Sequence, residues 1–71
     1  MGTDNVKPFK IRCKEYNISG IGLTKTEALR DLFLQLCAIL GTIEGIKKIK
    51  SWGMQDEEGY EEVMNELKKQ L

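Results

Sequence analysis

The sequence predicts an α+β fold: a small antiparallel sheet of two or three strands packed against two helices, in the order β-β-α-(β)-α. Three observations predict it. Apolar and polar side chains alternate over Phe9–Cys13, and a capping box opens an apolar stripe of helical spacing over 24–40. A second helical stripe runs over 56–71. The chain of 71 residues is expected to form a single small domain over 1–71, with residues 1–7 disordered.

The first predicted strand begins after Pro8, at a strand end where the missing N–H is tolerated. Its alternation places an apolar set on one face and a basic set on the other. The apolar set is Phe9, Ile11 and Cys13, and the basic set is Lys10, Arg12 and Lys14. The period-two pattern predicts a strand with one buried face.

A turn over 15–17 would allow residues 18–23 to return as a second, antiparallel strand. Ile18 has the opposite parity to Ile21 and Leu23. A β-bulge at Ser19-Gly20 would bring all three to the apolar face, because glycine accepts the backbone angles that a bulge requires. We therefore predict a bulged second strand.

Thr24 and Glu27 form the capping box of the first helix, in which Thr24 accepts from the Glu27 N–H and Glu27 reaches back to the Thr24 N–H. The helix is expected to end near Leu40, at Gly41. Its predicted core stripe is Leu29, Leu32, Phe33, Leu36, Ile39 and Leu40. Its predicted solvent side carries Lys25, Glu27, Arg30, Asp31 and Gln35, together with the apolar Leu34 and Ala38.

Residues 42–54 fit two interpretations. Ile43, Ile46 and Ile49 are three residues apart, as on one side of a short helix. The glycines and β-branched residues favour instead a strand from about Ile46 to Trp52, with its lysines facing solvent. We predict the strand.

A second helix is expected to begin at Asp56. Its stripe is Tyr60, Val63, Met64, Leu67 and Leu71. Acidic side chains crowd its first turns, and Lys68 and Lys69 lie in the last, as the helix dipole favours.

Composition excludes several functions. The chain has no histidine, so it has no Ser-His-Asp triad, no Cys-His pair and no imidazole metal ligand. No apolar run approaches the roughly 20 residues that span a bilayer, and the first residues lack signal-peptide features. We expect a cytoplasmic protein with Cys13 and Cys37 as buried thiols, no catalytic residue, no metal and no cofactor.

Two short resemblances lie at the junction of the second strand and the first helix. The pattern Gly-x-Gly-x-Thr-Lys-x-x-Ala over 20–28 is similar to that junction in double-stranded RNA-binding domains, where lysines meet phosphates. Only Lys25 matches, since Thr26 and Leu29 stand where the family has further lysines. Residues 22–28, Gly-x-Thr-x-x-Glu-Ala, resemble the same junction in HicB-type antitoxins, which would imply a toxin-binding domain. We assign the chain to neither family.

The apolar surface of the first helix is wider than one core contact needs, so we expect a second molecule to cover it. The predicted function is a non-catalytic protein–protein interaction module, a small regulator, inhibitor or antitoxin-like binder that forms a homodimer. The candidate partner-binding residues are Leu34, Ala38, Trp52, Glu58, Glu61 and Glu62.

The alternative is an RNA- or DNA-binding module. The first 50 residues hold nine basic and five acidic side chains, although the whole chain has zero net charge. A basic strand face and a helix N-terminus could bind phosphates. The candidate residues are Lys10, Arg12, Lys14, Lys25, Lys47, Lys48 and Lys50.

Overall fold

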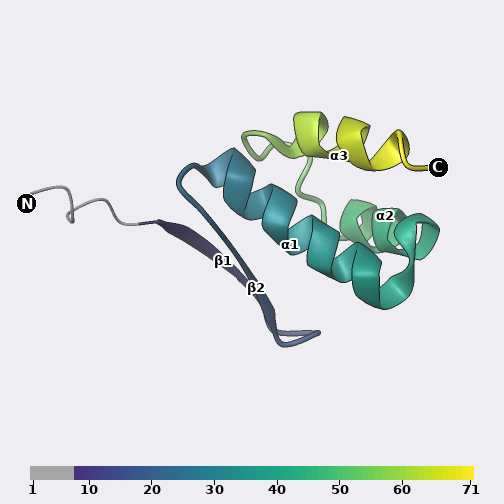
Figure 1. Ribbon diagram of the computed structural model, residues 1–71, viewed down its shortest axis with the longest axis horizontal. Coiled ribbons are helices and arrows are strands. Elements are labelled where there is room, and N and C mark those ends of the chain that lie inside the picture. Colours follow the sequence, from purple (N-terminus) through teal and green to yellow (C-terminus); the bar gives the residue numbers. More distant parts are fainter. Residues whose placement is uncertain (1–7) are drawn as a thin grey trace, which may run out of the picture.

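The computed structural model describes residues 8–71 as two strands followed by three helices. The elements are β1 (Phe9–Cys13), β2 (Ile18–Gly22), α1 (Lys25–Leu40), α2 (Thr42–Ser51) and α3 (Tyr60–Lys68). Helix α1 lies in the middle, with the β1–β2 hairpin on one side and α2 and α3 on the other (Figure 1). The predicted α+β class is confirmed, with the order β-β-α-α-α. The disorder expected for residues 1–7 lies outside the described residues.

The two strands form a regular antiparallel hairpin. Their register runs from Phe9 opposite Gly22 to Cys13 opposite Ile18, residue for residue. Asn17 closes the turn with a φ of 55°, in the left-handed region that asparagine tolerates better than most residues. Because the register has no extra residue, the predicted bulge at Ser19-Gly20 is wrong.

At the end of β2, the residues that face α1 are Gly20 and Gly22 rather than Ile21 and Leu23. Gly20 is buried, and a Cβ placed on it would lie 2.6 Å from the backbone nitrogen of Leu32. Ile21 and Leu23 are instead 52% and 65% exposed. The bulge was predicted because apolar side chains were expected to face the core. Here the backbone of β2 lies so close to α1 that no side chain fits between them.

The capping box begins α1 as predicted, with one difference. The Thr24 hydroxyl accepts from the Glu27 N–H at 3.2 Å, and the Glu27 carboxylate accepts from the Leu23 N–H, also at 3.2 Å, rather than from that of Thr24. At the other end the Gly41 N–H donates to the Cys37 carbonyl at 2.7 Å, and the φ of Gly41 is 92°. The buried residues of α1 are Ala28, Leu29, Leu32, Phe33, Leu36 and Cys37.

Ile39 was predicted in the core stripe and is 53% exposed, so that prediction is wrong. Gly45 of α2 packs against Cys37, where a Cβ on Gly45 would lie 2.7 Å from the Cys37 Sγ. Helix α2 therefore covers the Cys37 side of α1. Ile39, two residues further on, is rotated by about 200° around the helix and faces away from α2.

The strand predicted from Ile46 to Trp52 is also wrong, because this segment is helical over Thr42–Ser51. Ile46 and Ile49 are buried in the core, at the spacing of one helix face. Glycine and isoleucine disfavour a helix by no more than about 1 kcal/mol per residue, which the burial of two isoleucines exceeds. Gly45 is required by the close contact with α1 rather than by a strand.

Helix α3 begins at Tyr60 rather than at Asp56, because Gly59 has a φ of 85° and ends a series of turns. The predicted stripe is otherwise confirmed over Tyr60, Val63, Met64 and Leu67, which are all buried. Leu71 lies beyond the helix and is 69% exposed, so its place in the stripe was wrong. The Tyr60 ring packs edge-on against Phe33, with 6.0 Å between ring centroids.

Replacing Gly20 with alanine is expected to destabilise the fold by about 1–3 kcal/mol, because the new methyl group would push β2 away from α1. The measurement is chemical denaturation followed by circular dichroism. Ser19→Ala, at the neighbouring position of β2, is the matched control and should have a much smaller effect. Equal stability of Gly20→Ala and the original chain would contradict the close approach.

Candidate functional site

Side chains of α1 close the outer edge of β2. The Asp31 carboxylate accepts from the Ile21 N–H at 2.9 Å, and the Gln35 amide donates to the Ser19 carbonyl at 2.6 Å. Glu27 makes the corresponding bond to Leu23 one turn earlier, so the bonds follow a spacing of four residues along α1. The sequence placed these side chains on the solvent side of the helix, whereas they occupy hydrogen-bonding positions that another strand would use.

The outer edge of β1 is open. Ser19 and Ile21, whose backbone groups bond to α1, lie opposite Arg12 and Lys10. In an antiparallel ladder opposite residues either bond to each other or both point their backbone groups outward. The N–H and C=O of Lys10 and Arg12 therefore point away from β2. Within residues 8–71 no hydrogen bond reaches these outward groups.

An apolar groove of about 290 Å³ runs beside this open edge. Its lining residues are Ile11, Arg12, Cys13, Lys14, Glu15, Leu32, Trp52 and Met54. Ile11 comes from β1 and Leu32 from α1, while Trp52 and Met54 come from the connection between α2 and α3. This volume is at the lower end of the roughly 300–1,000 Å³ of pockets that enclose small ligands, and it can accommodate a few side chains.

Basic side chains lie at the groove: Arg12 and Lys14 line it, and Lys10 lies two residues before Arg12 in β1. Lys10, Arg12 and Lys14 are exposed, and none of them forms an ion pair with a carboxylate of residues 8–71. Glu15, the acidic residue of the groove lining, lies 2.6 Å from the Lys48 ammonium. That hydrogen bond is the main cause that raises the pKa of Lys48. The carboxylate of Glu15 is therefore compensated, and the edge of β1 keeps its positive charge.

The structure does not gather the predicted nucleic-acid-binding residues into one surface. Lys25 lies 2.6 Å from Glu57, and this hydrogen bond raises the pKa of Lys25. Lys47 lies 3.7 Å from Glu44 on the same helix, and Lys50 is exposed. Lys10 and Arg12 lie in β1 and Lys14 follows it, whereas Lys47, Lys48 and Lys50 lie on α2.

The predicted partner-binding residues are also dispersed. Trp52 lines the groove and is half-buried. Leu34 and Ala38 lie on the outward side of α1, where Leu34 is 42% exposed. Glu58 and Glu61 are exposed beside and within α3. Sequence reasoning missed Leu32 and Met54 as groove residues; the alternation of β1 was the available signal, but it does not show which segment lies beside the strand.

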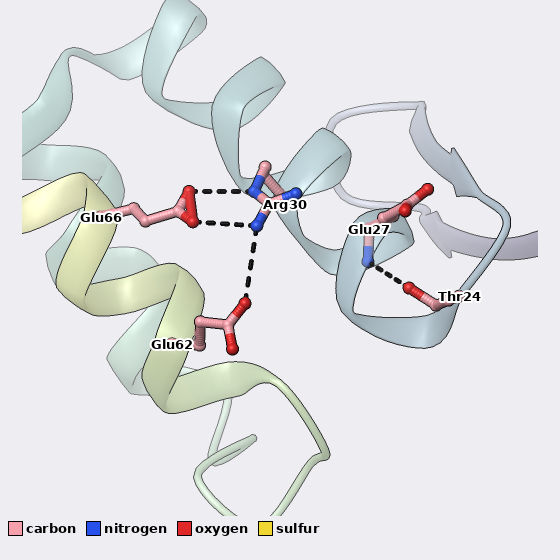
Figure 2. Close-up of polar contacts among 5 residues, drawn as sticks. All are labelled: Thr24, Glu27, Arg30, Glu62 and Glu66. Atoms are coloured by element: carbon pink, nitrogen blue, oxygen red, sulfur yellow. Dashed lines mark hydrogen bonds and ion pairs between the residues drawn. The ribbon is translucent and has the colours of Figure 1, made fainter.

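Arg30 joins α1 to α3 through two acidic side chains (Figure 2). Its guanidinium donates to both carboxylate oxygens of Glu66, at 2.9 and 2.8 Å, and lies 3.6 Å from the Glu62 carboxylate. The hydrogen bond from Arg30 is the main cause that lowers the pKa of Glu66. Glu62, predicted to bind a partner, thus lies at an internal contact between helices.

The two cysteines are free and differ in surroundings. Cys37 is buried as predicted, and this burial raises the pKa of its thiol. Cys13 lines the groove and is only partly buried, so the predicted burial is wrong for Cys13. Burial likewise raises the pKa of Tyr60. In residues 8–71 no three acidic, cysteine or histidine side chains are grouped as metal ligands. None of the helices described is long and apolar enough to traverse a bilayer.

No protein-family model, curated protein or solved structure matches this chain. What the groove and the open strand edge can bind therefore follows from their own geometry.

Glu66→Gln is expected to lower the melting temperature at pH 7, because it removes a carboxylate that Arg30 stabilises. A carboxyl group whose pKa is lowered on folding stabilises the fold above its ordinary value of 4.5, and this stabilisation is lost as pH falls through the lower folded pKa. The difference in melting temperature should therefore shrink below about pH 4.5. The control is Glu58→Gln, at an exposed carboxylate outside this contact. A difference that stays constant from pH 7 to pH 3 would contradict the assignment.

Proposed function

We propose that the chain is a non-catalytic protein–protein interaction module that binds an extended segment of another protein along β1. One observation carries this proposal: outward backbone groups of Lys10 and Arg12 lie directly beside an apolar groove. Main-chain hydrogen bonds to a sheet edge supply affinity in strand addition, and neighbouring pockets for alternate side chains supply specificity. The groove beside β1 has the position that such a pocket requires.

The small number of strands in the sheet supports the same function. A two-stranded sheet is marginally stable by itself, and here α1 supports one face and one edge. A third strand on β1 would cover apolar surface of Trp52 and Met54 that the chain leaves accessible in the groove. A small regulator or inhibitor would act in this way by occupying a segment of its target. The free thiols support a cytoplasmic location, where thiols stay reduced.

We further propose that the chain forms a homodimer through the outward side of α1. Leu34 and Ala38 are four residues apart, on one side of α1, and both are exposed. An isologous pairing of two such helix faces would remove these side chains from water. This surface is separate from the open edge of β1. Strand β2, and the α1 side chains that bond to it, lie between the two.

A selection from a random-peptide library tests the binding function. Peptides enriched on the immobilised chain should bind Met54→Glu at least about tenfold more weakly, since a charge in the groove must lose its hydration when an apolar side chain enters. Leu71→Glu adds the same charge at an exposed position and is the control. Failure to enrich any peptide, or equal binding to Met54→Glu, would refute the module.

Light scattering at micromolar concentration tests the homodimer. The chain should have the mass of two copies, and Leu34→Glu should have the mass of one, because the substitution buries a charge against its own copy. Leu71→Glu serves again as the control and should remain dimeric. If the original chain has the mass of one copy, the proposed homodimer is wrong, and the proposed binding of a strand at the groove is unaffected.

A further inference from the structure

We infer that the segment bound by β1 is an extended strand of another protein in which acidic and apolar side chains alternate. The inference rests on the function proposed above and specifies the chemistry of the partner. It follows from two properties of the edge: the direction in which the side chains of β1 point and the charges that stay uncompensated.

The outer face of β1 selects acidic side chains. Side chains of residues directly opposite each other in a sheet lie on the same face, about 4.5–5.5 Å apart at Cβ. Residues of an added strand opposite Lys10 and Arg12 therefore lie beside an ammonium and a guanidinium. Neither cation is paired with a carboxylate of residues 8–71, and Glu15 nearby is held by Lys48. Aspartate or glutamate fits these positions.

The inner face of β1 selects apolar side chains. The residue of the added strand opposite Ile11 shares the face of Ile11, which is directed toward α1 and the groove. A strand lies roughly 4.8 Å from its neighbour, so this residue enters the space between β1 and the connection that carries Trp52 and Met54. The groove there has a mainly apolar lining, and its volume accommodates only a few side chains. An apolar residue therefore fits this position of the added strand.

A second copy of β1 fits this edge poorly. Antiparallel pairing of two β1 strands about Ile11 would place Lys10 of each copy opposite Arg12 of the other, on one face. Like charges directly opposite each other destabilise a sheet. Basic residues on an edge strand also discourage pairing with identical edges. The occupant is therefore a strand of opposite charge from a different protein.

The test is fluorescence anisotropy with a labelled peptide in which valine and glutamate alternate over about eight residues, a common strand length. The double variant Lys10→Glu with Arg12→Glu should bind this peptide at least about tenfold more weakly. Lys68→Glu with Lys69→Glu makes the same charge change on exposed residues at the end of α3, and it should bind as the original chain does. Added salt should weaken binding, since Lys10 and Arg12 are exposed.

Amide hydrogen exchange of the unaltered chain gives a second readout that needs no variant. The amides of Lys10 and Arg12 should exchange rapidly in the free chain and slow when the peptide is added. The amide of Ile11, which points toward β2, is the internal control. Slow exchange of Lys10 and Arg12 in the free chain that depends on its concentration would show that a second copy occupies the edge, and it would overturn the inference.

Comparison ligands separate failure of the inference from failure of the proposed function. Equal affinity for a peptide of alternating valine and threonine would overturn the acidic preference and leave strand binding intact. Equal affinity for a peptide with the same valines and glutamates in two blocks would replace strand addition by simple charge attraction. Binding of no alternating peptide, or tighter binding of a single-stranded RNA of similar length, would overturn both the inference and the proposed function.

Discussion

The close approach of β2 to α1 is the constraint on which the rest of this structure depends. Gly20 and Gly22 have no side chains, so the backbone of β2 lies against the backbone of α1 near Ala28 and Leu32. At this separation the side chain of Asp31 can reach the edge of the strand. The contact that joins the sheet to the helix therefore also closes one edge of the sheet.

The two edges of the sheet therefore differ in whether their outward backbone groups are hydrogen-bonded. At β2, side chains of α1 bond to the groups that a third strand would use. At β1, the connection between α2 and α3 places Trp52 and Met54 beside the strand and leaves the outward groups of Lys10 and Arg12 unbonded within residues 8–71. A two-stranded sheet is marginally stable unless a further strand or a helix packs against it. Here, within the described residues, α1 bonds to the edge of β2 alone. The edge of β1, which has no such bonds there, lies beside an apolar groove and carries basic side chains.

The sequence predicted those elements whose ends are fixed by hydrogen bonds between residues close together in the chain. Thr24 and Gly41 determine the limits of α1 through bonds within four residues, so the sequence could place this helix. The identity of α2 could not be predicted in the same way. Gly45 weakens a helix locally, yet the structure needs it because α2 crosses Cys37 there. Ile21 was assigned to the core because a sequence shows apolarity but not how closely two backbones approach.

The groove was harder to predict because its walls come from three segments that are distant in the sequence. Its charge could not be read from composition either. The chain is neutral overall, but Lys10, Arg12 and Lys14 cluster along β1 and the turn after it, where the neighbouring Glu15 is paired with Lys48. A ligand at the edge of β1 responds to charges within about 8–10 Å, since salt screens more distant ones. This local cluster gives a neutral protein a basic edge, and in the proposed complex its charge would favour an acidic strand.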